Sequence, residues 1–172
     1  MIDKIEKFKA ILNEFNAVHN LTNYDNLDEV IKDSLDGLNY IKSTPKVAID
    51  VGSGAGIPAL FLAMKFTSCK WHLFEPNGKK SSFLTYAKVA LNLDNVIVHN
   101  DKIEKSDKFR ADLITSRALM RTKDLLLICK GFYDKDTEFL LYKGSEVANE
   151  IENIGAEIYS RGKRNYLVFR GV

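Results

Sequence analysis

The segment from 47 to 58 contains the residues whose types and spacing best fit ligand binding. Residues 47–51 form a short apolar, partly β-branched run that includes Asp50. Three glycines follow at alternate positions: Gly52, Gly54 and Gly56. An apolar segment, 59–66, is predicted to be a helix with Pro58 in its first turn. Because one glycine would suffice for a tight turn, three favour a loop that lets backbone N–H groups approach a ligand.

Two classes of ligand fit this loop. Gly54, Gly56 and Ala59 satisfy the dinucleotide fingerprint G-x-G-x-x-G/A. The longer motif Asp-Val-Gly-x-Gly-x-Gly, which starts at Asp50, resembles the first motif of Rossmann-like S-adenosylmethionine (SAM) methyltransferases. An acidic residue at the strand end favours the ammonium and sulfonium of SAM over a pyrophosphate, because opposite charges attract. The electrostatic argument therefore favours SAM over NAD.

A second acidic residue, Glu75, ends the strand predicted over 71–75. Glu75 lies 21 residues after Gly54, about the spacing at which an acidic side chain bonds a ribose hydroxyl. Both NAD and SAM contain such a ribose, so Glu75 indicates a nucleoside cofactor without choosing between them. Asn77 is predicted to cap the helix that follows.

The composition is that of one globular domain. The chain has 172 residues, with 25 Lys and Arg residues against 23 Asp and Glu residues. Its apolar runs are all shorter than the roughly 20 residues that span a bilayer, and residues 1–9 lack the apolar core of a signal peptide. Cys69 and Cys129 have no metal-ligand spacing and are expected to be buried thiols in a reducing compartment. We therefore expect a cytoplasmic protein with no membrane segment and no metal site.

The order of predicted elements indicates an α/β fold. Helices are predicted over 3–18 and from Asn26, and strands and helices alternate from 47 onward. Further strands are expected at 96–98, 111–115 and 139–142, and helices at 125–133 and 145–154. The last two strands, 156–160 and 166–169, lack room for a crossover and must form an antiparallel hairpin. We predict one domain, 1–172: an N-terminal helical extension (1–45) and a Rossmann-like methyltransferase core (46–172) with a seven-stranded, mostly parallel sheet.

Several short motifs, taken together, are more specific than the glycine loop. They are Asn20-Leu21-Thr22, Asp33-Ser34-Leu35, residues 50–58, Gly78-Lys79-Lys80 with Phe83-Leu84, residues 100–104, Ser116-Arg117-Ala118 and Lys143-Gly144. In this order they resemble the small-subunit ribosomal RNA methyltransferase G family, also called glucose-inhibited division protein B.

The resemblance implies transfer of a methyl group from SAM to N7 of one guanosine in the decoding-region loop of 16S ribosomal RNA. It implies cofactor contacts from Gly52 and Ile57, ribose contacts from Glu75, adenine contacts from Ile103 and Glu104, and a place for Arg117 between cofactor and substrate. The full set of expected cofactor-binding residues is Asp50, Gly52, Gly54, Gly56, Ile57, Glu75, Asn77, Ile103, Glu104 and Arg117. The expected RNA-binding residues are Asn20, Lys79, Lys80, Arg117, Arg121 and Lys143.

The expected chemistry requires no acid–base residue. Guanine N7 carries no proton, and the sulfonium already activates the methyl group, so alignment of the reactants can supply most of the rate. We accordingly predict no catalytic residue, a monomer, and 16S ribosomal RNA or the 30S subunit as partner. Two alternatives stay open: an NAD-linked oxidoreductase, and a non-catalytic RNA-binding module with a SAM fold.

Overall fold

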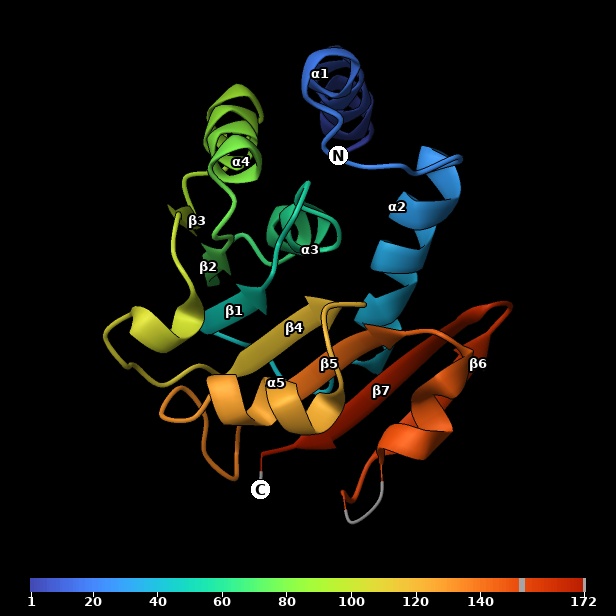
Figure 1. The fold of residues 1–172 in the computed structure, drawn as a ribbon, viewed down its shortest axis with the longest axis vertical. Coiled ribbons are helices and arrows are strands. Elements are labelled where there is room, and N and C mark those ends of the chain that lie inside the picture. The colour runs from blue at the N-terminus through green and yellow to red at the C-terminus, as the bar shows by residue number, and fades with distance from the viewer. Residues whose placement is uncertain (152–153, 172) are drawn as a thin grey trace.

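A mixed β-sheet runs through the centre of the protein (Figure 1). The computed structural model describes residues 1–151 and 154–171. Within them the sheet has seven strands in the order β3-β2-β1-β4-β5-β7-β6. The strands are β1 (Val47–Val51), β2 (Lys70–Phe74), β3 (Val96–His99), β4 (Leu113–Arg117), β5 (Glu138–Lys143), β6 (Glu157–Arg161) and β7 (Arg164–Arg170).

The pairing of these strands confirms the predicted fold class. Strands β3, β2, β1, β4 and β5 are parallel, whereas β7 runs antiparallel to both β5 and β6. The β6–β7 hairpin turns at Gly162, whose φ of 59° lies in the left-handed region that glycine tolerates. Because all five parallel strands point the same way, the loops that follow β1, β2 and β4 meet at one edge of the sheet.

Helices cover both faces of the sheet (Figure 1). One face carries α1 (Ile2–His19), α2 (Leu27–Asp36), α3 (Ala59–Lys65) and α4 (Gly78–Ala90), and the other carries α5 (Thr122–Ile128). Short 3₁₀ turns lie at Gly37–Tyr40, Ile103–Lys105 and Ser145–Glu150. Each face has its own core. Phe8 of α1 packs against Phe61 and Phe83 on one face, whereas Ile49, Phe132 and Phe139 belong to the core on the α5 side. No helix among the described residues is long and apolar enough to cross a membrane.

Two predicted helices differ from the structure. The helix expected over 125–133 is α5, Thr122–Ile128, and the helix expected over 145–154 is a 3₁₀ turn, Ser145–Glu150; residues 152 and 153 lie outside the described residues. Both differences involve Glu150, whose carboxylate accepts hydrogen bonds from the backbone N–H and the hydroxyl of Thr122, each at 2.9 Å. This contact caps the start of α5 and joins residues 28 positions apart, so local sequence patterns did not reveal it.

Helix α2, the second helix of the N-terminal region, is fixed to the sheet by two tyrosine hydroxyls. Asn26 caps α2 as predicted, since its side chain accepts from the Glu29 N–H at 3.1 Å. Tyr142 donates to the Ser34 carbonyl at 2.8 Å, and Tyr166 donates to the Asp33 carbonyl at 3.0 Å. Both rings are fully buried. The C-terminal half of α2 therefore has a defined position over β5 and β7.

The close packing of α2 on Tyr142 leads to a stability prediction. In Gly37→Ala the added Cβ would lie 2.2 Å from the Tyr142 hydroxyl, so α2 or the ring must shift. We expect a loss of about 1–3 kcal/mol in the free energy of unfolding, measured by urea denaturation. The double variant Gly37→Ala/Tyr142→Phe should lose less than the sum of its single variants, because the phenylalanine removes the clashing oxygen. Wild-type stability of Gly37→Ala would contradict this packing.

Candidate active site

The glycine loop follows β1 and is bound to the end of β2. The N–H groups of Gly52 and Ser53 both donate to the Phe74 carbonyl, at 2.9 and 3.1 Å. All three glycines have positive φ, 71° at Gly52, 56° at Gly54 and 82° at Gly56, which explains why glycine occurs at each. A Cβ on Gly56 would lie 2.5 Å from the Leu60 side chain, whereas a Cβ on Gly54 would meet, among the described residues, only the Gly52 carbonyl oxygen, at an ordinary contact distance of 3.9 Å. Gly56 is thus needed for packing, and Gly54 leaves room beside the loop.

The Glu75 carboxylate links this loop to the start of α4. Glu75 is 6% exposed and accepts from the Gly54 N–H and from the Asn77 N–H, both at 2.8 Å. Asn77 in turn caps α4 as predicted, because its side chain accepts from the N–H groups of Lys79 and Lys80 at 3.1 Å. Glu75 thus lies at the glycine loop, as its spacing from Gly54 predicts. The ribose contact expected of Glu75 stays a prediction.

Asp50 lies beneath the loop as a second buried acid. It is 1% exposed, and its carboxylate accepts a hydrogen bond from the Thr115 hydroxyl at 2.5 Å. Burial raises the pKa of Asp50 to about 6; the negative charge of Glu75 adds to the rise, and the bond from Thr115 opposes it. Two carboxylates therefore concentrate negative charge at the ends of β1 and β2.

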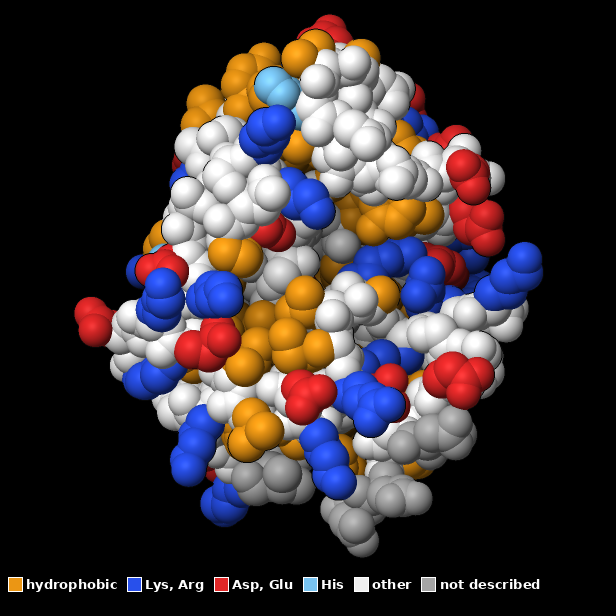
Figure 2. Space-filling view, in the orientation of Figure 1, with side chains coloured by type: hydrophobic (Ala, Val, Ile, Leu, Met, Phe, Trp, Pro, Cys, Tyr) orange, Lys and Arg blue, Asp and Glu red, His pale blue; other side chains and the backbone are white. Residues whose placement is uncertain are grey.

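A pocket of about 190 Å³ opens beside the loop, and Figure 2 shows hydrophobic side chains gathered near the middle of this face. Its lining brings together three of the predicted cofactor residues, Gly52, Ile103 and Glu104. The remaining lining residues were not predicted: Val51, Phe74, Pro76, Asp101, Lys102, Leu119, Met120 and Ile128. The position of the 119–120 segment directly after Ser116-Arg117-Ala118 was the signal that could have identified it.

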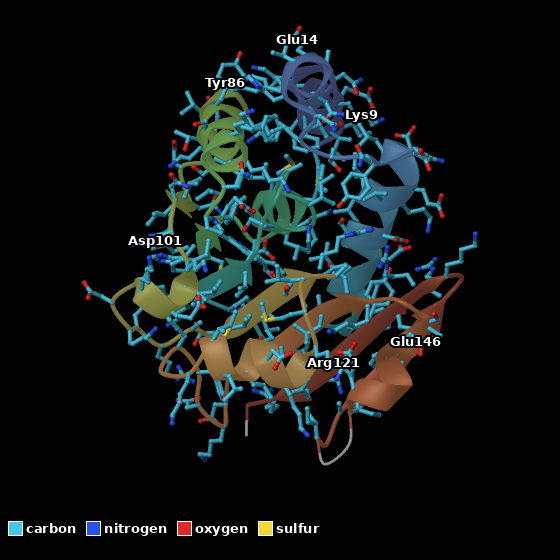
Figure 3. The ribbon with its side chains drawn as sticks, in the orientation of Figure 1. Lys9, Glu14, Tyr86, Asp101, Arg121 and Glu146 are labelled. Atoms are coloured by element: carbon cyan, nitrogen blue, oxygen red, sulfur yellow. The ribbon has the colours of Figure 1, made fainter. Side chains whose placement is uncertain are left out.

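Leu119 closes one side of this pocket. A Cβ added to Gly52 would lie 2.7 Å from Leu119 Cδ1, so the two residues are in close contact across the pocket. Ala118, just before Leu119, has a φ of 48°, unusual for a residue with a side chain. Asp101 lines the pocket from the segment after β3, and Arg121 is exposed at the start of α5 (Figure 3).

Lys143 supports the same segment from within the protein. Its side chain is 8% exposed, and its ammonium donates to the Met120 carbonyl and to the Glu150 carboxylate, both at 2.7 Å. The first of these bonds holds the 119–121 segment, and the second joins Lys143 to the carboxylate that caps α5. The RNA contact expected of Lys143 stays a prediction. Of the other predicted RNA-binding residues, Asn20 is exposed at the end of α1, and Lys79 and Lys80 lie in the first turn of α4.

Arg117 lies at the end of β4 with a side chain that is 7% exposed. Its Nη2 lies 3.5 Å from an Asp33 carboxylate oxygen, and its Cζ lies 5.7 Å from the Tyr24 ring centre and 5.9 Å from that of Tyr142. Burial lowers the pKa of Arg117, and the nearby charge of Arg164 lowers it further. Within the described part of the chain, Nη1 of Arg117 is buried with no hydrogen-bond partner. A buried guanidinium donor without a partner is costly, which favours a ligand as its acceptor.

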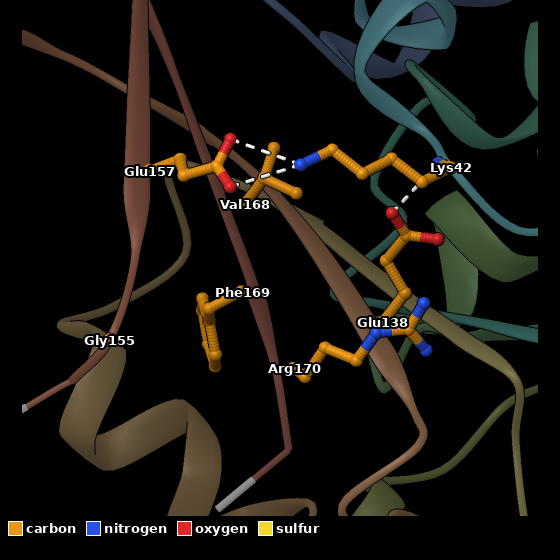
Figure 4. A pocket seen from close by; sticks show the side chains of 7 residues that line it. All are labelled: Lys42, Glu138, Gly155, Glu157, Val168, Phe169 and Arg170. Atoms are coloured by element: carbon orange, nitrogen blue, oxygen red, sulfur yellow. Dashed lines mark hydrogen bonds and ion pairs between the residues drawn. The ribbon is translucent and has the colours of Figure 1, made fainter.

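A second pocket, of about 310 Å³, lies near Glu138 at the start of β5 (Figure 4). There the Lys42 N–H and the Ser43 N–H and hydroxyl donate to the buried Glu138 carboxylate. The Lys42 ammonium pairs with Glu157 at 3.0 Å. Because these charged groups bond one another, they fix the loop before β1 on β5 and β6.

The sheet order, the glycine loop and the two acids at the ends of β1 and β2 define a Rossmann-like methyltransferase domain. Solved structures share this fold at low sequence identity. A putative S-adenosyl-L-methionine-dependent methyltransferase from Methanococcus maripaludis matches with a TM-score of 0.69 at 13% identity over 96% of this chain and 93% of that one. A SAM-dependent methyltransferase from Aquifex aeolicus matches with a TM-score of 0.67 at 16% identity, covering 96% and 97%.

Sequence comparison identifies the family within this class. The family model described as rRNA small subunit methyltransferase G (GidB) matches residues 1–170. The ribosomal RNA small subunit methyltransferase G of Campylobacter hominis is 56% identical over 98% of this chain and 92% of its own length. That of Campylobacter curvus is 58% identical over 96% and 89%. The chain belongs to the rRNA small subunit methyltransferase G family.

The glycine loop provides a first test of the site. Gly54→Ala adds a methyl group at a positive φ, which costs about 1 kcal/mol of stability, and it obstructs the approach of a ligand to the backbone. We expect at least a tenfold weaker affinity for S-adenosylhomocysteine by calorimetry. Gly162→Ala is the matched control, since Gly162 also has a positive φ and open surroundings but lies in the β6–β7 turn. Equal affinities for the two variants would refute the role of the loop.

The raised pKa of Asp50 leads to a second test. Below pH 6 the Asp50 carboxyl of the unliganded protein is protonated, so a ligand that carries an ammonium must displace that proton to gain the attraction. The dissociation constant for S-adenosylhomocysteine should therefore rise as the pH falls from 7 to 5, by up to about tenfold per unit below pH 6. Asp50→Asn should flatten this profile. A flat wild-type profile would exclude charge coupling between Asp50 and the ligand.

Proposed function

We propose that this protein transfers the methyl group of SAM to N7 of a guanosine in the decoding-region loop of 16S ribosomal RNA. Membership in the rRNA small subunit methyltransferase G family supports this activity. The structural observation that carries the proposal is the pair of buried carboxylates, Asp50 and Glu75, beneath and beside the glycine loop.

These carboxylates favour SAM over a dinucleotide. A pyrophosphate at the loop would need free backbone N–H donors, but the Gly54 N–H already donates to Glu75. The same phosphates would be repelled by Asp50 and Glu75, whereas the ammonium and sulfonium of SAM would be attracted. An NAD-linked oxidoreductase is therefore the weaker alternative.

When bound, SAM supplies an activated methyl group, and the residues of this chain bind and orient it. Glu75 would accept hydrogen bonds from the ribose, since each of its oxygens retains a lone pair beyond its backbone bond. Ile103 and Glu104 would lie at the adenine in the 190 Å³ pocket, with Leu119 as the opposite wall. Asp50, Gly52, Gly54, Gly56, Ile57 and Asn77 would shape the loop around the cofactor.

Guanine N7 has a free lone pair and no proton, so the acceptor needs no general base. Holding that nitrogen in line with the methyl group can lower the barrier by up to about 7–11 kcal/mol. Arg117 would orient the acceptor, because its Nη1, which has no hydrogen-bond partner among the described residues, can donate to a phosphate or to a base oxygen of the RNA.

Around this site, RNA contact would come from cations on phosphates. Lys79 and Lys80 would act from the first turn of α4, Arg121 from the start of α5, and Asn20 from the end of α1. Lys143 would contact RNA beside the 119–121 segment, which it holds through the Met120 carbonyl. We further propose that the chain acts as one domain and as a monomer in the cytoplasm, on 16S ribosomal RNA or the 30S subunit.

The proposal is tested by methyl transfer from tritiated SAM to 30S subunits that lack this modification, with the labelled nucleotide mapped afterwards. Arg117→Ala and Arg117→Lys should each lose at least tenfold in kcat, because neither offers a planar, multiple donor. Arg110→Ala is the control, since Arg110 is an exposed arginine just before β4, at the other end of that strand. It should keep activity within twofold.

Three outcomes would contradict parts of this proposal. Wild-type protein that binds S-adenosylhomocysteine and 30S subunits without turnover would support the non-catalytic RNA-binding module instead. Tight binding of NADH would support the oxidoreductase. Full activity of Arg117→Ala would exclude Arg117 from orienting the acceptor.

A further inference from the structure

The Asp33 carboxylate, near the C-terminal end of α2, pairs with two arginines that are far apart in the sequence. Arg164, the first residue of β7, donates from Nε to Asp33 Oδ2 at 3.0 Å. Arg117 at the end of β4 places Nη2 3.5 Å from the same oxygen. The three side chains are 22%, 21% and 7% exposed for Asp33, Arg164 and Arg117, so water screens this cluster only partly.

The position of Asp33 is fixed independently of these ion pairs. Its own carbonyl accepts from the Tyr166 hydroxyl, and the next carbonyl, that of Ser34, accepts from the Tyr142 hydroxyl. Both tyrosines come from the sheet strands β7 and β5. The carboxylate therefore reaches the arginines from a backbone that is already bound to the sheet.

The electrostatic situation of Arg117 requires such a partner. Burial and the positive charge of Arg164 both disfavour the charged guanidinium of Arg117, and Asp33 opposes them. A buried charge that loses its counter-charge is strongly destabilised in place. Asp33 is the acidic residue that pairs with Arg117 in the described part of the chain. Without the Asp33 carboxylate, we expect Arg117 to leave its position near the rings of Tyr24 and Tyr142 and to move toward solvent.

We propose that Asp33 is a positioning residue for the methyl-transfer reaction. By attracting Nη2 of Arg117 it holds the guanidinium plane so that Nη1, unpartnered among the described residues, is available to the target nucleotide. The inference rests on the proposed function, because it assigns Arg117 to the acceptor side of that site. It also gives the N-terminal helical region a part in the reaction beyond covering the core.

Kinetics with two matched variants test the proposal. Asp33→Asn keeps the size of the side chain and removes its charge; we expect kcat on 30S subunits to fall at least tenfold, with KM changed less than threefold. Asp36→Asn is the control, because Asp36 is also in α2 and also pairs with the hairpin, through Arg161 at 3.0 Å, without contacting Arg117. It should stay within twofold of wild type. Asp33→Glu, which keeps the charge, should recover part of the loss.

A double-variant cycle separates positioning from a general structural effect. If Asp33 acts through Arg117, then Asp33→Asn should cost little further kcat in an Arg117→Ala background. Multiplicative losses in the double variant would refute the proposal, as would wild-type kcat in Asp33→Asn. Thermal denaturation of every variant shows that the compared proteins are folded.

A measurement on the free protein tests the positioning of Arg117 separately from the proposed methyl-transfer activity. Phenylglyoxal modifies accessible arginines, and the extent at each arginine can be followed by peptide mass spectrometry. We expect Arg117 to be modified at least fivefold faster in Asp33→Asn than in wild type or Asp36→Asn. Unchanged protection of Arg117 would overturn the positioning role, whereas an inactive wild type with normal protection would overturn only the assigned reaction.

Discussion

The Glu75 carboxylate is the contact on which the arrangement of the site depends. Positive φ at three glycines bends the chain after β1, and a buried loop N–H without an acceptor would be costly. Glu75 supplies acceptors for Gly54 and Asn77 at once, while the Phe74 carbonyl accepts from Gly52 and Ser53. The loop after β1, the end of β2 and the first turn of α4 therefore have fixed relative positions.

Most of the fold could be predicted because it depends on local patterns. Apolar runs, glycine positions and the short turn at residues 162–163 indicated the sheet and its terminal hairpin. The bounds of α5 and the 3₁₀ turn Ser145–Glu150 depend instead on the long-range bonds from Thr122 to Glu150. Such bonds leave no periodic trace in the sequence, so the predicted helices there were misplaced.

The candidate site residues also divide into those whose position follows from local patterns and those whose position depends on long-range contacts. Arg117 was predictable because parallel strands present their carboxyl ends to ligands, and it does end β4. Lys143 also ends a strand, and its bonds to Met120 and Glu150 could not be predicted from the sequence. Residue type alone does not indicate which groups a charged side chain at a strand end contacts, because its acidic partners come from other elements of the fold. Asp33 belonged to a matching motif, yet only the structure placed it beside Arg117 and Arg164.

Charge is separated across the point where the strand order reverses. Asp50 lies near the end of β1 and Glu75 directly follows β2 on one side, and Arg117 ends β4 on the other. A cationic methyl donor is attracted to the acidic side, and a polyanionic acceptor to the basic side. The two reactants are thereby drawn to neighbouring positions with the pocket of Gly52 and Leu119 between the strand ends. In the proposed reaction, the sheet topology would set the direction in which the methyl group moves. Asp33 would keep Arg117, and with it the positive charge, at the end of β4.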